Sequence, residues 1–181
     1  DGAGCWLMPG MIDDQVHFRE PGLTDKADMA SESRAAVAGG ITSFMDMPNV
    51  KPPTIDHEAL VAKLDMARGR CAANYGFHLG ATNDNIEAIK RVDGTRAAGV
   101  KIFMGASTGK MLVDDEAALE AIFEHSPLPI LTHCEDTPMI EANADKARAA
   151  YGEDVPIRQH PVIRSREACI ASSKKAMDLA T

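Results

Sequence analysis

The chain has 181 residues, of which 45% are hydrophobic, and it carries a formal net charge of −8. This length and composition allow a substantial buried core and exclude a disordered chain. The negative charge argues against a general affinity for nucleic acid or anionic membranes, because both present negative phosphates to a partner.

Four cysteines are scattered along the chain, at Cys5, Cys71, Cys134 and Cys169. None of them has CxxC spacing, which favours reduced thiols over a disulfide framework or a zinc ribbon. No apolar run is long enough to cross a membrane, and no signal peptide is recognised. These features predict a cytoplasmic protein without a membrane or nucleic-acid partner.

Strand-like and helix-like segments alternate along the sequence. Strand-like runs begin near Leu7, Ile41, Ala73, Gly99 and Pro129, about one βα unit apart. Helical patterns are expected over 28–38, 56–68, 85–92 and 114–124, with further helices after Pro138 and over 165–179. This alternation predicts an α/β protein with a parallel sheet covered by helices, either a barrel or an open doubly wound sheet.

The first strand is expected to be a buried strand over residues 7–16, and it ends in polar residues. Because strand side chains alternate between faces, Asp13, Gln15 and His17 are expected to point the same way. In a parallel barrel this strand end lies at the mouth, where chemistry is done. The polar row is therefore interpreted as a set of candidate ligands.

The run from Pro9 to Gly22 resembles the first strand of the amidohydrolase superfamily, in which a His-x-His pair binds a metal. Its continuation, His17-Phe18-Arg19-Glu20-Pro21-Gly22, is similar to the dihydroorotase branch. Gln15 stands where the family has the first His. An amide oxygen is a weak, neutral ligand for zinc, so the resemblance implies a metal ligand at His17 and a weaker one at Gln15.

Strand two ends in Met47-Pro48-Asn49, which also matches the dihydroorotase pattern. In that family the Asn and the Arg of the first motif hold the substrate carboxylate, which implies these roles for Asn49 and Arg19. An Arg fork pairs with a carboxylate through two hydrogen bonds, and a carboxamide adds an oriented donor. Taken alone, the Pro48-Asn49 dipeptide favours an ordinary turn residue at Asn49, and its occurrence together with the Arg19 segment favours the binding role. Arg19 also separates dihydroorotases from allantoinases, which typically carry another polar residue there.

Lys101 and His133 lie on later strands, each among apolar residues. A buried Lys is costly unless its charge is paired or its chemistry is changed. In the family this Lys is carboxylated to a carbamate that bridges two metals, and the strand-five His is a metal ligand, so the resemblance implies both roles here. The residues alone also allow a Lys that reaches solvent at the sheet end and a structural His.

The resemblance implies zinc, as one or two ions, and the interconversion of dihydroorotate and N-carbamoyl-aspartate in pyrimidine biosynthesis. In the family a metal-activated hydroxide attacks the ring carbonyl, and an Asp at the end of strand eight shuttles the proton. That Asp and a strand-six His have no counterpart in this chain. No catalytic residue is therefore assigned, and we expect these 181 residues alone to be inactive.

The resemblance selects a metal-dependent hydrolase barrel of the (β/α)8 type. Such a barrel needs about 250 residues, and the five βα units found here predict an incomplete one, as a single partial domain over residues 1–181. Residues 1–6 resemble the end of the family's N-terminal β-sandwich segment. Strands one and five would then present unpaired edges.

Two alternatives stay open. One is a non-catalytic dihydroorotase-like structural subunit, which Gln15 favours and the retained Lys101 and His133 oppose. The other is a related cyclic amidohydrolase of the allantoinase or hydantoinase type. Beyond a small-molecule substrate, the candidate partners are a second copy of the chain, in a homo-oligomer, and aspartate transcarbamoylase.

Other motifs are assigned no chemistry. The loop over 105–111 imitates a phosphate-binding loop, but it is one residue short of GxxxxGK[ST] and has Met after Lys110. The first strand is not followed by a GxGxxG turn, which argues against an open nucleotide-binding sheet. The remaining histidines are interpreted as structural or exposed, namely His57, His78, His125 and His160.

Overall fold

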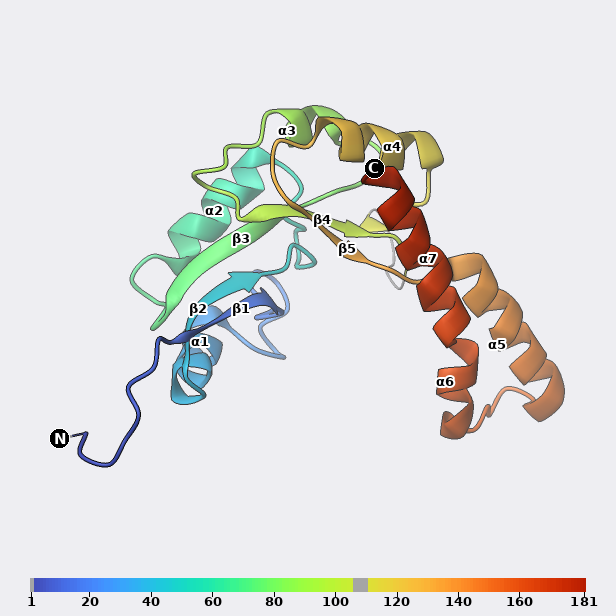
Figure 1. The fold of residues 1–181 in the computed structure, drawn as a ribbon, viewed down its shortest axis with the longest axis horizontal. Helices are drawn as coiled ribbons and strands as arrows, with labels where there is room; N and C mark the ends of the chain where they lie inside the picture. The colour runs from blue at the N-terminus through green and yellow to red at the C-terminus, as the bar shows by residue number, and fades with distance from the viewer. Residues whose placement is uncertain (1, 106–110) are drawn as a thin grey trace. The chain divides into compact units, whose positions relative to one another are not determined.

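The computed structural model describes residues 2–105 and 111–181, and strands and helices alternate along it (Figure 1). The strands are β1 (Met11–Val16), β2 (Ile41–Asp46), β3 (Asn74–Gly80), β4 (Gly99–Phe103) and β5 (Ile130–His133). The helices are α1 (Met29–Ala38), α2 (His57–Ala67), α3 (Ile86–Lys90), α4 (Glu116–His125), α5 (Thr137–Tyr151), α6 (His160–Ile163) and α7 (Arg166–Leu179), with the 3-10 helix η2 (Ile157–Gln159). Most of the rejected phosphate loop falls outside the described residues.

The chain divides into two compact units. Unit 1 comprises residues 1–80 and 91–99, and in it β2 pairs in parallel with β1 and with β3. Unit 2 comprises residues 81–90 and 100–181, and in it β4 pairs in parallel with β5. Helices α1 and α2 belong to the first unit and α3 to α7 to the second. The assignment of residues 1–181 to one partial domain, with 1–6 as a separate remnant, stays a prediction.

The long helices begin where short polar side chains cap them. In each case the capping side chain accepts a hydrogen bond from a backbone N–H in the first turn, and these caps are Asp28, Asp56, Asp115, Asp136 and Ser165. Three helices predicted from the sequence, over 28–38, 56–68 and 165–179, include the capping residue as their first position. Their observed starts therefore lie one residue later.

The first strand differs from its prediction. It begins at Met11, and it is exposed over most of its length, with Met11 61% and Ile12 66% exposed. Trp6 and Leu7, which were expected to open the strand or precede it, are exposed as well. Apolar side chains of a strand are buried only where another element packs against them. β1 is an edge strand, and its outer edge has no such neighbour among the described residues. The prediction of a buried first strand is wrong.

The register of β1 against β2 is interrupted by a β-bulge. Between the pairs Asp13–Phe44 and Val16–Asp46, β1 advances three residues while β2 advances two. Paired residues of parallel strands lie on the same face, so Asp13 and Val16 share a face although strict alternation would separate them. The expected common face for Asp13 and His17 is therefore wrong.

Each unit has its own apolar core. In unit 1 the fully buried side chains include Met29, Phe44, Met47, Leu60 and Phe77. In unit 2 they include Val100, Ile102, Val113, Leu119 and Ile122. Within the part of the chain that the structure describes, no helix is long and apolar enough to cross a membrane.

Candidate functional site

The segments that follow β1 and β2 bring two predicted site residues into contact. Nδ1 of His17 lies 3.0 Å from Oδ1 of Asn49. An amide oxygen only accepts, so this hydrogen bond places the ring proton on Nδ1 and leaves the lone pair of the neutral imidazole on Nε2. This is the tautomer in which His17 can bind a metal through Nε2.

Arg19 lies two residues after His17. It is half-buried and has an unusual backbone conformation. Its φ is 66°, in the left-handed region, which costs a non-glycine residue about 1–3 kcal/mol and persists only where the surrounding structure holds it. The carbonyl of Arg19 accepts a hydrogen bond from the N–H of Leu23 at 3.1 Å. At Gly22 a Cβ would collide with the carbonyl oxygen of Lys51. This loop therefore packs closely against the loop after β2, and the hydrogen bond to Leu23 holds the Arg19 carbonyl within it.

A buried ion pair supports both loops. Nζ of Lys63, on α2, lies 2.8 Å from Oδ2 of Asp46, and both side chains are at most 1% exposed. Oδ1 of Asp46 accepts a hydrogen bond from the N–H of Phe18 at 2.9 Å, and Lys63 donates to the carbonyl of Met47 at 2.9 Å. Burial lowers the pKa of Lys63, and the Asp46 carboxylate opposes that fall. The pair was missed from the sequence, where the only signal is a Lys between the apolar positions of a helix.

Gln15 lies in the bulge of β1 and is exposed. Its N–H donates to Oδ1 of Asp13 at 3.0 Å, a bond made within the strand itself. The carbonyl of Asp14 lies 3.1 Å from Nε2 of His78 on β3. His78 is only 1% exposed. The structure thus places a buried histidine against the strand segment that precedes His17.

In unit 2, Lys101 lies in the middle of β4 and is 1% exposed. Its Nζ lies 5.1 Å from the centre of the Phe103 ring, and among the described residues it forms no ion pair with a carboxylate. Burial lowers the pKa of Lys101, with Cys134 opposing that change. The buried environment therefore makes the charged form of Lys101 less favourable than it is in water.

His133 lies on the same face of the strand pair as Lys101. Lys101 pairs with Leu131 and Phe103 pairs with His133, so these four side chains share one face of β4 and β5. Nε2 of His133 is buried and has no hydrogen bond within the described part of the chain. The nearest carboxylate oxygen, Oε2 of Glu135, lies 3.7 Å away.

Arg164 fixes that carboxylate. Its guanidinium binds both oxygens of Glu135, with Nε 3.1 Å from Oε1 and Nη2 against Oε2. This contact lowers the pKa of Glu135. The two residues are 29 positions apart, in segments without a common local pattern, so this pair could not be predicted from the sequence.

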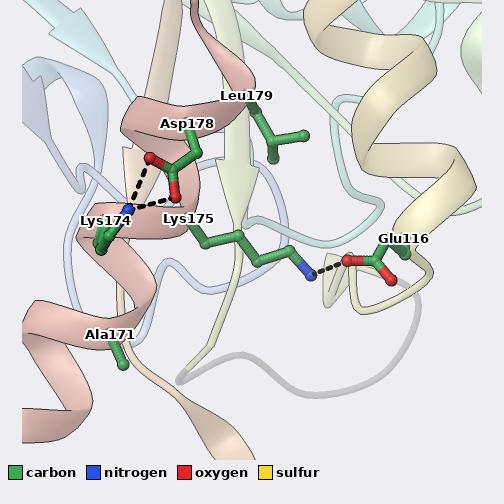
Figure 2. A pocket seen from close by; sticks show the side chains of 6 residues that line it. All are labelled: Glu116, Ala171, Lys174, Lys175, Asp178 and Leu179. Carbon is green, nitrogen blue, oxygen red and sulfur yellow. Dashed lines mark hydrogen bonds and ion pairs between the residues drawn. The ribbon is translucent and has the colours of Figure 1, made fainter.

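The groove drawn in Figure 2 lies elsewhere in unit 2 and has a volume of about 340 Å³. None of the predicted site residues lines it; its lining consists of Glu116, Ala171, Lys174, Lys175, Asp178 and Leu179. The charges around it are paired, Lys174 with Asp178 at 2.6 Å and Lys175 with Glu116 at 3.1 Å. We assign it no catalytic role.

The donors fit a metal only if Lys101 contributes. Among the described residues, no three His, Cys, Asp or Glu side chains gather into a group that could hold an ion. Lys101 and His133 instead offer a buried amine without an ion-pair partner and a buried ring nitrogen without a hydrogen bond. A carboxylated Lys101 would add anionic oxygens to the imidazole nitrogen of His133, and zinc binds donors of both kinds. His17, Arg19 and Asn49 lie in unit 1, which is described by itself.

Comparisons with known proteins point to one enzyme family, although no family model matches the sequence. A dihydroorotase of Methanosarcina acetivorans is 40% identical over 184 residues, which cover 99% of this chain and 38% of the relative. An allantoinase of Rubrobacter xylanophilus is 35% identical over 83% of this chain and 34% of its own length. The solved structure of an L-hydantoinase (dihydropyrimidinase) from Arthrobacter aurescens matches 99% of this chain and 40% of that one, with a TM-score of 0.91 and 26% identity. The chain thus spans between about a third and two fifths of the length of these three proteins.

Proposed function

Since the chain belongs to the dihydroorotase-like amidohydrolases, whose solved relatives include hydantoinases, we propose that it carries the first part of a metal-dependent site for cyclic amide hydrolysis. The proposed reaction interconverts dihydroorotate and N-carbamoyl-aspartate. The observation that carries the proposal is Lys101, buried without an ion-pair partner among the described residues, on one strand face with His133.

Lys101 and His133 are the proposed zinc ligands of unit 2. A neutral Lys amine adds to carbon dioxide and releases a proton, and the resulting carbamate gives an anionic oxygen pair. The lowered pKa of Lys101 favours the neutral amine that this addition needs. His133 would use its buried Nε2. When bound, zinc supplies an activated water and polarises the carbonyl under attack.

His17 is the proposed ligand of unit 1, through Nε2. Asn49 holds the opposite ring nitrogen at 3.0 Å, which fixes the tautomer and limits rotation of the ring. Gln15, exposed in the bulge, is the weakest of the predicted ligands. One zinc ion held by Lys101 and His133 is therefore the simplest arrangement, with a second ion as the alternative.

The proposed carboxylate site consists of Arg19 and Asn49. The guanidinium of Arg19 can pair with both oxygens of the carboxylate on the dihydroorotate ring. Asn49 uses its oxygen for His17, and its NH₂ group is a donor suited to the same carboxylate. Asn49 would in this way connect substrate binding to a metal ligand.

The 35% identity with an allantoinase supports a second candidate function, the hydrolysis of another cyclic amide. Arg19 favours dihydroorotate, because a ring carboxylate needs a cationic partner. A non-catalytic subunit that assembles with aspartate transcarbamoylase would have no need for Lys101 in a buried strand. We further propose a cytoplasmic location, and that the proton shuttle comes from residues other than these 181, so that they do not turn over dihydroorotate alone.

Zinc analysis of the folded chain tests the proposal. The chain is dialysed with bicarbonate and metal, then compared with the variants Lys101→Ala and His133→Ala. His125→Ala and Lys90→Ala are matched controls, because both side chains are exposed and lie on helices. We expect bound zinc in the parent chain and both controls, and its loss in the two site variants. A folded chain that retains no zinc would refute the proposed site.

A further inference from the structure

His78 stands outside the proposed ligand set, yet it lies on the same sheet face as His17. In unit 1, Asp46 pairs with Val16 on one side and with Phe77 on the other, so these three side chains share a face. His17 and His78 each follow one of the paired residues. By alternation both lie on the opposite face, away from the one on which Lys63 of α2 meets Asp46.

The bulge of β1 decides which face His17 occupies. Without the extra residue, the pairing that starts at Asp13 and Phe44 would continue by twos and place His17 on the face of Asp46. That face carries the buried ion pair between Asp46 and Lys63. The extra residue of the bulge shifts the alternation of side chains by one position, so His17 falls on the face opposite Asp46. The bulge thus turns His17 to the face on which His78 lies.

We infer that His78 is a positioning residue, which secures the bulge of β1 and thereby sets the direction of His17. A bulge leaves one residue of the strand outside the regular ladder, so its carbonyl lacks the usual partner on the neighbouring strand and can accept from another donor. Nε2 of His78 lies 3.1 Å from the carbonyl of Asp14, 64 residues away, and since a carbonyl only accepts, His78 donates. The inference rests on the proposed function only for the role of His17 as a ligand.

Substitutions at His78 separate donor geometry from packing. His78→Gln keeps an N–H donor at about the distance of Nε2 from the backbone, whereas His78→Asn is one methylene shorter and cannot reach Asp14. His78→Leu removes the donor and keeps apolar bulk. His57→Leu is the matched control, because His57 is an exposed histidine of the same unit, at the start of α2.

Backbone hydrogen exchange and the nitrogen resonances of the His17 ring provide the readouts in the full chain. We expect His78→Leu and His78→Asn to speed exchange of the amides of residues 14–17 by about tenfold, as loss of one hydrogen bond would. In the same two variants, the nitrogen resonances of the His17 ring should shift. His78→Gln should restore both readouts and His57→Leu should change neither. If His78→Leu does not fold, the comparison of His78→Asn with His78→Gln is sufficient to test the positioning role.

The inference is overturned if all His78 variants match the parent chain in both readouts, or if Gln behaves like Asn. Cobalt(II) absorption with bicarbonate, recorded on the same samples, separates this inference from the proposed function. If the parent chain binds no cobalt while the exchange pattern is as expected, the metal site fails and the positioning role of His78 stands. If cobalt binds and exchange does not respond to His78, the metal site stands and the positioning role fails.

Discussion

Lys63→Met should destabilise the chain strongly, because it leaves the carboxylate of Asp46 buried without its cation. Asp46 and Lys63 are at most 1% exposed and 2.8 Å apart. Removing one partner of such a pair costs about 3–5 kcal/mol, whereas a neutral pair of similar volume costs little. A domain of this kind is stable by about 5–15 kcal/mol, so the loss is a large share of the total. Urea unfolding followed by circular dichroism measures it.

Two further variants isolate the charge effect from lost packing. Lys63→Met combined with Asp46→Asn removes both charges, and it should recover at least half of the lost free energy of unfolding. Lys90→Met breaks an exposed pair with Glu87 and should cost less than about 1 kcal/mol. A Lys63→Met variant within 1 kcal/mol of the parent chain, which is below the range for a buried pair, would refute the reasoning.

Three other predictions concern single sites. Lys101→Met should raise the melting temperature of the metal-free chain, measured by calorimetry, because it replaces a buried amine by an apolar group of similar length. Arg164 lowers the pKa of Glu135, so this pair stabilises the chain fully above the ordinary Glu pKa near 4.5 and is lost as the pH falls through the lowered pKa. Urea titrations between neutral and acid pH should therefore show less acid destabilisation in Glu135→Gln than in the parent chain. Met11→Lys should reduce self-association in sedimentation experiments, since Met11 is a 61% exposed apolar side chain on the edge strand β1; unchanged association would contradict this.

Local features of the sequence were enough to predict much of the fold. Helical patterns marked the helices to within a few residues, and short apolar runs at regular intervals marked the parallel strands. These signals are readable because the periodicity of a helix or a strand depends on neighbouring residues only. The resemblance to dihydroorotases, read from the segment around His17, also agrees with the relatives found.

The tertiary structure alone decided how these elements are used. Exposure of β1 depends on which element covers it, and the face of His17 depends on one extra residue in the ladder with β2. The contact of His78 with the Asp14 carbonyl spans 64 residues, and that of Arg164 with Glu135 spans 29. Sequence periodicity describes a single strand or helix. Strand register and the partners of buried polar groups arise only when separate elements pack together, and for that reason no local pattern could give them.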